Sequence, residues 1–223
     1  MQINICMIAI PNKLWQIWIG PKPAPAQWMN TWPKHHPNWD YKIIDNTVLE
    51  NKQFHNRHLI DAYLNLTRVD KYAGAADLIR YEMLYEHGGF MPGADAVCVN
   101  NTDELWIMDA DYCYSVYENE QIRPGFISPI YACNPKNSFV EKIIDRLHSV
   151  SLDTLRNKEA WQVTGNEFLA NFVKEISPKI KIFPSHFFIP EHFSDPTSRY
   201  TGPDKIYAEQ NWGTTKQNYH KGQ

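Results

Sequence analysis

The stretch that decides the fold is residues 71–99, KYAGAADLIRYEMLYEHGGFMPGADAVCV. Its apolar residues recur at three- and four-residue spacing, which predicts an amphipathic helix over residues 71–87. The glycine pair at 88–89 then ends the helix, because glycine readily takes the backbone conformations found there. Small and β-branched residues over 94–99 predict a short buried strand. Asp95 stands at its beginning, where a carboxylate needs a cation, a hydrogen-bond donor or solvent.

Strands and helices alternate along the rest of the chain, which indicates an α/β protein. Strand-like segments are expected over residues 3–10, 14–20, 39–45, 112–118, 126–133 and 179–184. Further helices are expected over residues 26–32, 47–64, 136–149 and 159–175. Sheets of this class carry helices on both faces and bind ligands at the carboxyl ends of their strands, a position that suits Asp95. The length of 223 residues allows one large core, so we expect a single domain over residues 1–223.

The composition excludes several classes of partner. Lys and Arg number 22 against 25 Asp and Glu, so no broad cationic surface is expected for nucleic acid or anionic lipid. The four cysteines lack CxxC spacing and lie in apolar runs, which favours a reducing, cytoplasmic location. Residues 1–10 predict a first strand rather than a signal peptide. No apolar run approaches about 18 residues, so no transmembrane segment is expected. The GxSxG, GxGxxG and Walker A motifs do not occur.

Three residues are candidates for a ligand site from their position alone. Trp18 ends an apolar segment just before Gly20, where its ring can face a cleft and stack on a base, although most tryptophans serve packing. Asp77 and Arg80 are three residues apart and therefore share a helix face. They form either a surface ion pair or, because their neighbours are apolar, part of a site.

Asp95 also has simpler explanations and competitors. Beside Gly93 it can be an ordinary turn residue. Asp109 and Asp111 form a closer acid pair, which suits a metal site or a two-carboxylate glycoside hydrolase, but both precede a strand and lack a glycine-lined entry. The nine histidines are mostly scattered, so zinc is not expected.

Taken in order, the segments IPNKLWQIWIG (10–20), AADLIRYEMLYEHGGF (75–90) and Ala94-Asp95 resemble the glycosyltransferases of family 32 and their relatives among the large clostridial toxins. The resemblance covers most of the chain. It implies a single GT-A-type (Rossmann-like) domain, with a mixed sheet flanked by helices. It further implies that the aspartate after the glycines holds a divalent cation, Mn²⁺ or Mg²⁺, against the diphosphate of a nucleotide sugar. Hard carboxylate and phosphate oxygens suit such an ion.

The resemblance also assigns roles to residues of this chain. Trp18 would stack on the base, Asp77 and Arg80 would hold donor-sugar hydroxyls, and Asp95 would bind the metal. Asp77, Arg80 and Asp95 would be the catalytic residues. In the C-terminal part, Gln210 would be the second metal ligand, and Trp212 and Thr214 would close over the diphosphate.

This chain departs from the family pattern at three positions. Gly93 stands where the family has the first aspartate of its Asp-x-Asp motif, and Gln210 replaces a His or Asn. Met91 replaces a Tyr. A glycine at 93 is explained either by a positive φ after Pro92 or by the close approach of a phosphate or ribose.

The predicted function is a metal-dependent, retaining hexosyl- or deoxyhexosyltransferase that uses a nucleotide sugar, expected to be a UDP-sugar, and a glycan or other acceptor. Retention follows from the resemblance alone. Because of Gly93 and Gln210, the first alternative is a nucleotide-sugar-binding protein with impaired turnover. The second alternative is the two-carboxylate glycoside hydrolase.

Overall fold

The computed structural model describes residues 10–107, 113–216 and 218–219, except for the side chain of Thr214. Within this part, six strands form a mixed sheet in the order β2-β1-β3-β6-β5-β7. These strands are β1 (Lys13–Ile17), β2 (Asp40–Ile44), β3 (Gly89–Met91), β5 (Cys113–Asn119), β6 (Arg123–Cys133) and β7 (Lys181–Phe183). β1 runs parallel to β2 and β3, whereas β6 is antiparallel to β3 and β5, and β7 is parallel to β5. The mixed α/β sheet flanked by helices confirms the predicted fold class.

A small second sheet joins two distant segments, β4 (Ala96–Cys98) and β8 (Ala208–Gln210), in antiparallel pairing. The α-helices are α1 (Ala26–Met29), α2 (Thr31–His35), α3 (Thr47–Asn51), α4 (Arg57–Leu64), α5 (Lys71–His87), α6 (Ser138–His148), α7 (Leu152–Asn157), α8 (Ala160–Val163), α9 (Asn166–Ile176) and α10 (Gly213–Lys216). Short 3₁₀ turns cover Asp103–Leu105, Ser185–Phe187 and Pro196–Ser198. Within the described residues, none of these helices combines the length and the apolar character that a membrane span requires.

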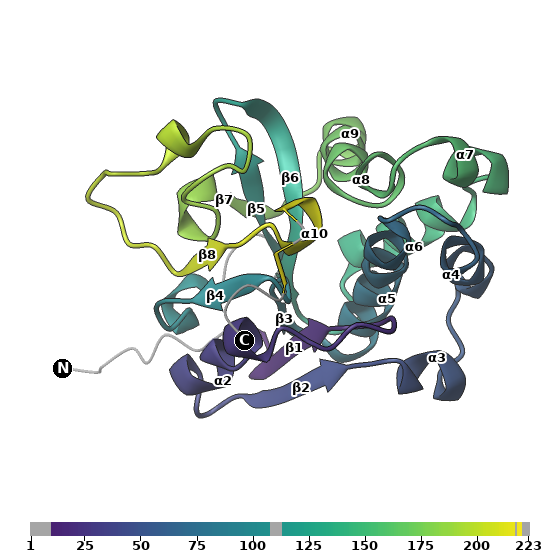
Figure 1. Ribbon diagram of the computed structural model, residues 1–223, viewed down its shortest axis with the longest axis horizontal. Helices are drawn as coiled ribbons and strands as arrows, with labels where there is room; N and C mark the ends of the chain where they lie inside the picture. The colour runs from purple at the N-terminus through teal and green to yellow at the C-terminus, as the bar shows by residue number, and fades with distance from the viewer. Residues whose placement is uncertain (1–9, 108–112, 217, 220–223) are drawn as a thin grey trace.

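The large sheet separates two apolar cores. Successive residues of a strand point to opposite faces, so Leu14 joins one core while Trp15 joins the other. On β3, Phe90 joins the same core as Leu14, and Met91 joins the same core as Trp15. In Figure 1, α4 to α9 lie on one side of the strands, whereas β4, β8 and the loops around them lie on the other.

The central helix α5 runs over Lys71–His87, which confirms the predicted bounds. Its amphipathic character was wrongly predicted, because every residue from Gly74 to Leu84 except Ala76 is buried. The helix packs against α4, α6 and α8 and contacts the sheet at β3 and β6, so most of its circumference is covered. A helix in this position loses the polar outer face that periodicity assumes.

Two glycines shape the end of α5 as the sequence predicts. Gly88 ends the helix at φ 63° and Gly89 follows at φ 100°, both in the region that side chains disfavour. At Gly89 a Cβ would also collide with the carbonyl of Lys13. The glycine pair therefore allows β3 to begin directly after the helix and to lie against β1.

Several other expectations need correction. The predicted helices over 26–32, 47–64 and 159–175 are each divided in two. α7, β3 and β8 were not predicted from the sequence. The expected strand over 3–10 and the acid pair Asp109 and Asp111 fall almost wholly outside the described residues.

Candidate active site

A cavity of about 530 Å³ opens where β1 and β3 end, bordered by α5 and by the C-terminal segment. Six of the seven predicted site residues line it: Trp18, Asp77, Arg80, Asp95, Gln210 and Trp212. The seventh, Thr214, belongs to α10, but its side chain lies outside the described part of the structure. The size is typical of a site for a small molecule or cofactor. The location at strand ends agrees with the position expected for Asp95.

Asp77 and Arg80 form a buried pair, so the surface ion pair considered from the sequence is wrong. Their exposed fractions are 7% and 9%. Arg80 Nη1 donates to Asp77 Oδ1, and the Thr164 hydroxyl donates to Oδ2 at 3.0 Å. Burial raises the pKa of Asp77, while Arg80 and Thr164 oppose the shift. The carboxylate is thereby fixed in position beside the cavity.

Arg80 keeps an unused donor. Its Nε is buried and has no hydrogen-bond partner among the described residues. A buried guanidinium N–H without a partner is costly, and a ligand hydroxyl or phosphate oxygen in the cavity can satisfy it.

Asp95 is held by the C-terminal segment. Gln210 Nε2 donates to Asp95 Oδ1 at 2.8 Å, and the backbone N–H of Gly213 donates to Oδ2 at 2.8 Å. The pairing of β4 with β8 places Ala96 opposite Gln210, which accounts for this contact. Burial raises the pKa of Asp95, and the two donors oppose the shift. Asp95 is therefore more than a turn residue.

The oxygens around Gly93 suit a divalent cation. A Cβ at this glycine would lie 2.9 Å from Asp95 Oδ1 and 3.5 Å from Gln210 Oε1, so both oxygens face the space that the missing side chain leaves. Gln210 Oε1 is buried without a hydrogen-bond partner among the described residues. One carboxylate and one amide oxygen match the hard ligands of Mg²⁺ and Mn²⁺, which commonly take further ligands from water and substrate phosphates.

The protein does not supply a full ligand shell from its acids, histidines and cysteines. In the described ranges, no group of three or more such side chains is arranged to hold a metal. Asp95 and Gln210 therefore fit a cation that is shared with a bound phosphate better than a cation enclosed by protein.

Trp18 follows β1 and is half-buried at the cavity wall. Its indole N–H donates to the carbonyl of Lys22 at 2.7 Å, which fixes the ring. The ring of Tyr219 meets it edge-on, with centroids 4.9 Å apart. Tyr219 also lines the cavity and was not predicted, because nothing in the sequence near it marks a contact with residue 18.

Trp212 takes a left-handed backbone conformation, with φ 56°. This region costs a bulky residue roughly 1–3 kcal/mol, and such strain is often found at functional sites. Its indole N–H donates to the carbonyl of Glu191 at 3.1 Å, and the residue lines the cavity. The position fits a residue that contacts a ligand.

Comparisons with known proteins find similar sequences and similar folds. Residues 25–112, which contain α5 and Asp95, match the family described as "Glycosyltransferase sugar-binding region containing DXD motif". Over 215 residues the chain is 24% identical to an uncharacterized glycosyltransferase of Acanthamoeba polyphaga mimivirus, covering 91% of this chain and 76% of the relative.

Two solved structures share the fold. The PaToxG glycosyltransferase superposes with a TM-score of 0.58 at 17% identity, covering 75% of this chain and 70% of its own. The ligand-free glycosyltransferase domain from the YGT toxin gives a TM-score of 0.52 at 10% identity, covering 79% and 80%. The chain thus has a GT-A-like fold and contains a DXD-type sugar-binding region. The sequence match, the viral relative and both structural neighbours are described as glycosyltransferases.

Proposed function

We propose that the protein is a metal-dependent, retaining glycosyltransferase that transfers a hexosyl or deoxyhexosyl group from a UDP-sugar to a glycan acceptor. The observation that carries the proposal is the convergence of Trp18, the Asp77–Arg80 pair and the Asp95–Gln210 pair on one cavity. Retention of configuration rests on the family resemblance alone. We take residues 1–223 as one catalytic domain.

Each side chain has a task in this proposal. Trp18 stacks on the base, a contact that any nucleobase can make through its π-face. Asp77 accepts from hydroxyls of the donor sugar, and the unused N–H groups of Arg80 donate to them. Trp212 and Thr214 cover the diphosphate and keep water from it.

Asp95 and Gln210 would hold the divalent cation. When bound, the cation supplies positive charge next to the diphosphate as it leaves. Gly93 leaves open the space between these oxygens and the ligand.

The proposed test separates turnover from nucleotide binding. Asp77→Asn should abolish release of UDP from UDP-sugars but leave UDP affinity, measured by calorimetry, nearly unchanged, because Asp77 is assigned to the sugar. Asp61→Asn is the matched control, since Asp61 also pairs with an arginine of its own helix, Arg57, but on the surface. Equal loss of affinity for UDP and UDP-sugar in Asp77→Asn would contradict the assignment.

A second candidate is a nucleotide-sugar-binding protein with impaired turnover. The observation that favours it is that Gln210 and Gly213 already satisfy both oxygens of Asp95, while Gly93 supplies no second acid. Tight binding of a UDP-sugar without hydrolysis or transfer would establish this candidate. A cytoplasmic location stays a prediction, which fits the free, buried state of Cys98, Cys113 and Cys133.

A further inference from the structure

Part of the cavity wall has no task in binding the donor. It is formed by Ser128 and Pro129 of β6, Trp161 of α8 and Asn166 of α9. This wall borders the same cavity as Asp77, and Gly165 separates the two, since a Cβ there would lie 3.0 Å from Trp161 Cα and 3.4 Å from Asp77 Oδ2. A molecule against Trp161 would therefore be next to the sugar that Asp77 holds.

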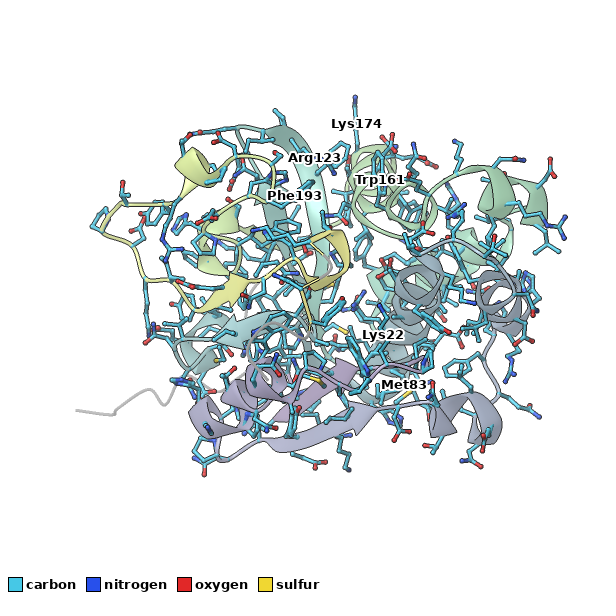
Figure 2. The ribbon with its side chains drawn as sticks, viewed as in Figure 1. Lys22, Met83, Arg123, Trp161, Lys174 and Phe193 are labelled. Carbon is cyan, nitrogen blue, oxygen red and sulfur yellow. The ribbon has the colours of Figure 1, made fainter. Side chains whose placement is uncertain are left out.

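Beside this wall, three aromatic rings surround one guanidinium group. Arg123 lies 5.5 Å from the ring centroid of Phe126, 5.2 Å from that of Trp161 and 5.8 Å from that of Phe193. We call these four residues the Arg123 cluster. Figure 2 shows Arg123, Trp161 and Phe193 together at one end of β6. Each member of the cluster is partly exposed.

A buried carboxylate holds the guanidinium group of Arg123 in place. Glu118, with a side chain 2% exposed, lies 3.2 Å from Arg123. The same carboxylate accepts from the amide of Asn166 and lies 3.0 Å from His192 Nε2. Because the backbone N–H of Ser194 donates to His192 Nδ1, the ring carries its proton on Nε2 and donates to Glu118. This network fixes Arg123 before any ligand binds.

The charge of the cluster is already balanced. Glu118 neutralises Arg123, and the nearby Glu159 accepts from the indole N–H of Trp161. An acidic ligand would therefore bring a negative charge to a place where the positive charge of Arg123 is already paired. Hydroxyl groups, in contrast, can use the remaining N–H groups of the guanidinium.

The cluster also reaches the diphosphate side of the site. The ring of Phe193 lies 4.9 Å from that of Trp212, which is assigned to cover the diphosphate. The Arg123 cluster thus lies next to both sides of the proposed reacting centre, with Trp161 beside the sugar and Phe193 beside the leaving group.

We propose that the Arg123 cluster is the acceptor subsite and that the acceptor is an uncharged sugar. A pyranose has an apolar face of C–H groups that suits the aromatic rings and an edge of hydroxyls that suits Arg123. This inference rests on the proposed glycosyltransferase function, since it assigns the second substrate of the same cavity.

The test measures binding of simple glycosides by saturation-transfer NMR in the presence of UDP and Mg²⁺, which is diamagnetic and does not broaden the ligand signals. Methyl β-D-glucoside and methyl α-D-mannoside should bind the wild-type protein, and methyl β-D-glucuronide should bind more weakly. Trp161→Ala should weaken binding of the neutral glycosides at least about tenfold, as loss of a central aromatic contact does. Trp161→Phe should restore most of it, because a ring remains.

Arg123→Gln tests the polar half of the subsite, since it removes the charge but keeps a donor for Glu118. It should also weaken glycoside binding. Arg146→Ala is the matched control, because Arg146 likewise pairs with a glutamate, Glu175, and lies 5.0 Å from the ring centroid of Phe172. Neither of these partners lines the cavity, whereas the Trp161 ring beside Arg123 does. Binding to this variant should equal the wild type.

Each contrary result of these binding experiments refutes one particular part of the proposal. If UDP binds but no glycoside binds the wild type, the acceptor proposal fails while the proposed function stands. Equal binding to the Trp161→Ala variant refutes the location. Tighter binding of the glucuronide refutes an uncharged acceptor. A threonine- or tyrosine-containing peptide that binds in place of glycosides, with the same dependence on Trp161, replaces the sugar by a protein acceptor. Absence of UDP binding refutes the proposed function itself.

Discussion

Gly93 shows how a missing side chain defines a site. It is not among the described glycines with positive φ, so the conformational explanation considered from the sequence is wrong. The structure gives a different steric reason, because a Cβ there would lie 2.9 Å from Asp95 Oδ1, and the close approach of a phosphate or ribose stays a prediction. The glycine therefore leaves room for the carboxylate of Asp95.

We predict opposite effects for two changes at the proposed metal site. Asp95→Asn should abolish turnover and Mn²⁺ binding, because an amide replaces the carboxylate that is assigned to the metal. Gly93→Asp should bind Mn²⁺ at least as tightly as the wild type, since a second carboxylate compensates for the displacement of Asp95. Electron paramagnetic resonance of Mn²⁺ measures both affinities.

Gly93→Ala is the control for this comparison, because it displaces Asp95 without adding a charge. It should bind Mn²⁺ more weakly than both the wild type and Gly93→Asp. Equal turnover by the wild type and Asp95→Asn would contradict metal dependence.

Trp18→Ala should weaken UDP binding by roughly 1–3 kcal/mol, the range for loss of a stacking partner, while the protein still unfolds cooperatively. Its ring is only half-buried, so the core does not depend on it. Trp32, which is fully buried, provides the contrast, because Trp32→Ala should cost about 3–5 kcal/mol of folding free energy. Calorimetric UDP titration and thermal melting separate these effects. A large loss of stability in Trp18→Ala would assign Trp18 to the core.

The sequence predicts the site residues that lie on short segments with regular spacing. Asp77, Arg80 and Asp95 are of this kind, because helix periodicity and the glycine pair fix their positions. Trp161 and Tyr219 join the cavity only through tertiary contacts. No local pattern marks such residues, so the acceptor wall could not be foreseen.

At the scale of elements, length decides what periodicity can predict. α5 has seventeen residues and was predicted to the residue, whereas only two of the four three-residue strands, β4 and β7, lie in predicted strand segments, and β3 and β8 were missed. A three-residue strand shows no alternation, and its pairing with a distant segment determines its existence. The pair β4–β8 is the instructive case, since it brings Gln210 to Asp95 across 115 positions.

The end of α2 gives a prediction about pH. His36 is buried, and its Nδ1 lies 3.0 Å from the carbonyl of Trp32, so Nδ1 carries the proton. Its Nε2 accepts from the backbone N–H of Thr102 at 3.1 Å. Burial lowers the pKa of His36 below its ordinary value of 6.5. Protonation of His36 at Nε2 would place two hydrogen-bond donors, Nε2–H and the backbone N–H of Thr102, against each other.

The direction in which stability changes with pH follows from proton linkage. Below the ordinary pKa of 6.5 the unfolded chain binds this proton more readily than the native protein, so stability falls as the pH drops through that value. The melting temperature should therefore decrease between about pH 7 and pH 5. His36→Gln should lower stability at pH 8 but reduce this slope, while His35→Gln, at an exposed neighbour, should leave it unchanged. An unchanged slope in His36→Gln would contradict the assignment.

At the scale of the whole molecule, the cavity exists because segments from both ends of the chain meet beside α5. The segment after β1 supplies Trp18 from the N-terminal part, and the C-terminal part supplies Gln210, Trp212, Thr215 and Tyr219. Alternation of strands and helices suffices to predict the α/β class, because it reflects the local pattern. The division into two cores depends on which face each strand residue takes, which only the assembled sheet determines.

The assembled cavity predicts a joint effect of nucleotide and metal on stability. UDP should stabilise the protein only when Mn²⁺ or Mg²⁺ is present, because the diphosphate would otherwise approach the carboxylate of Asp95 with charge of the same sign. At 100 times its dissociation constant, UDP should add about 2.7 kcal/mol, which corresponds to a rise of roughly 5–10 °C in melting temperature.

Thermal melts with UDP, with uridine and with no nucleotide, each in Mn²⁺ and in EDTA, test this expectation. Uridine lacks the diphosphate, so its smaller effect should not depend on the metal, whereas the UDP effect should vanish in EDTA and in Asp95→Asn. Equal stabilisation by UDP in EDTA would exclude the metal role of Asp95 while leaving nucleotide binding intact. A protein that ignores UDP under every condition would favour the glycoside hydrolase instead, because such an enzyme binds sugars through two carboxylates and has no use for a nucleotide.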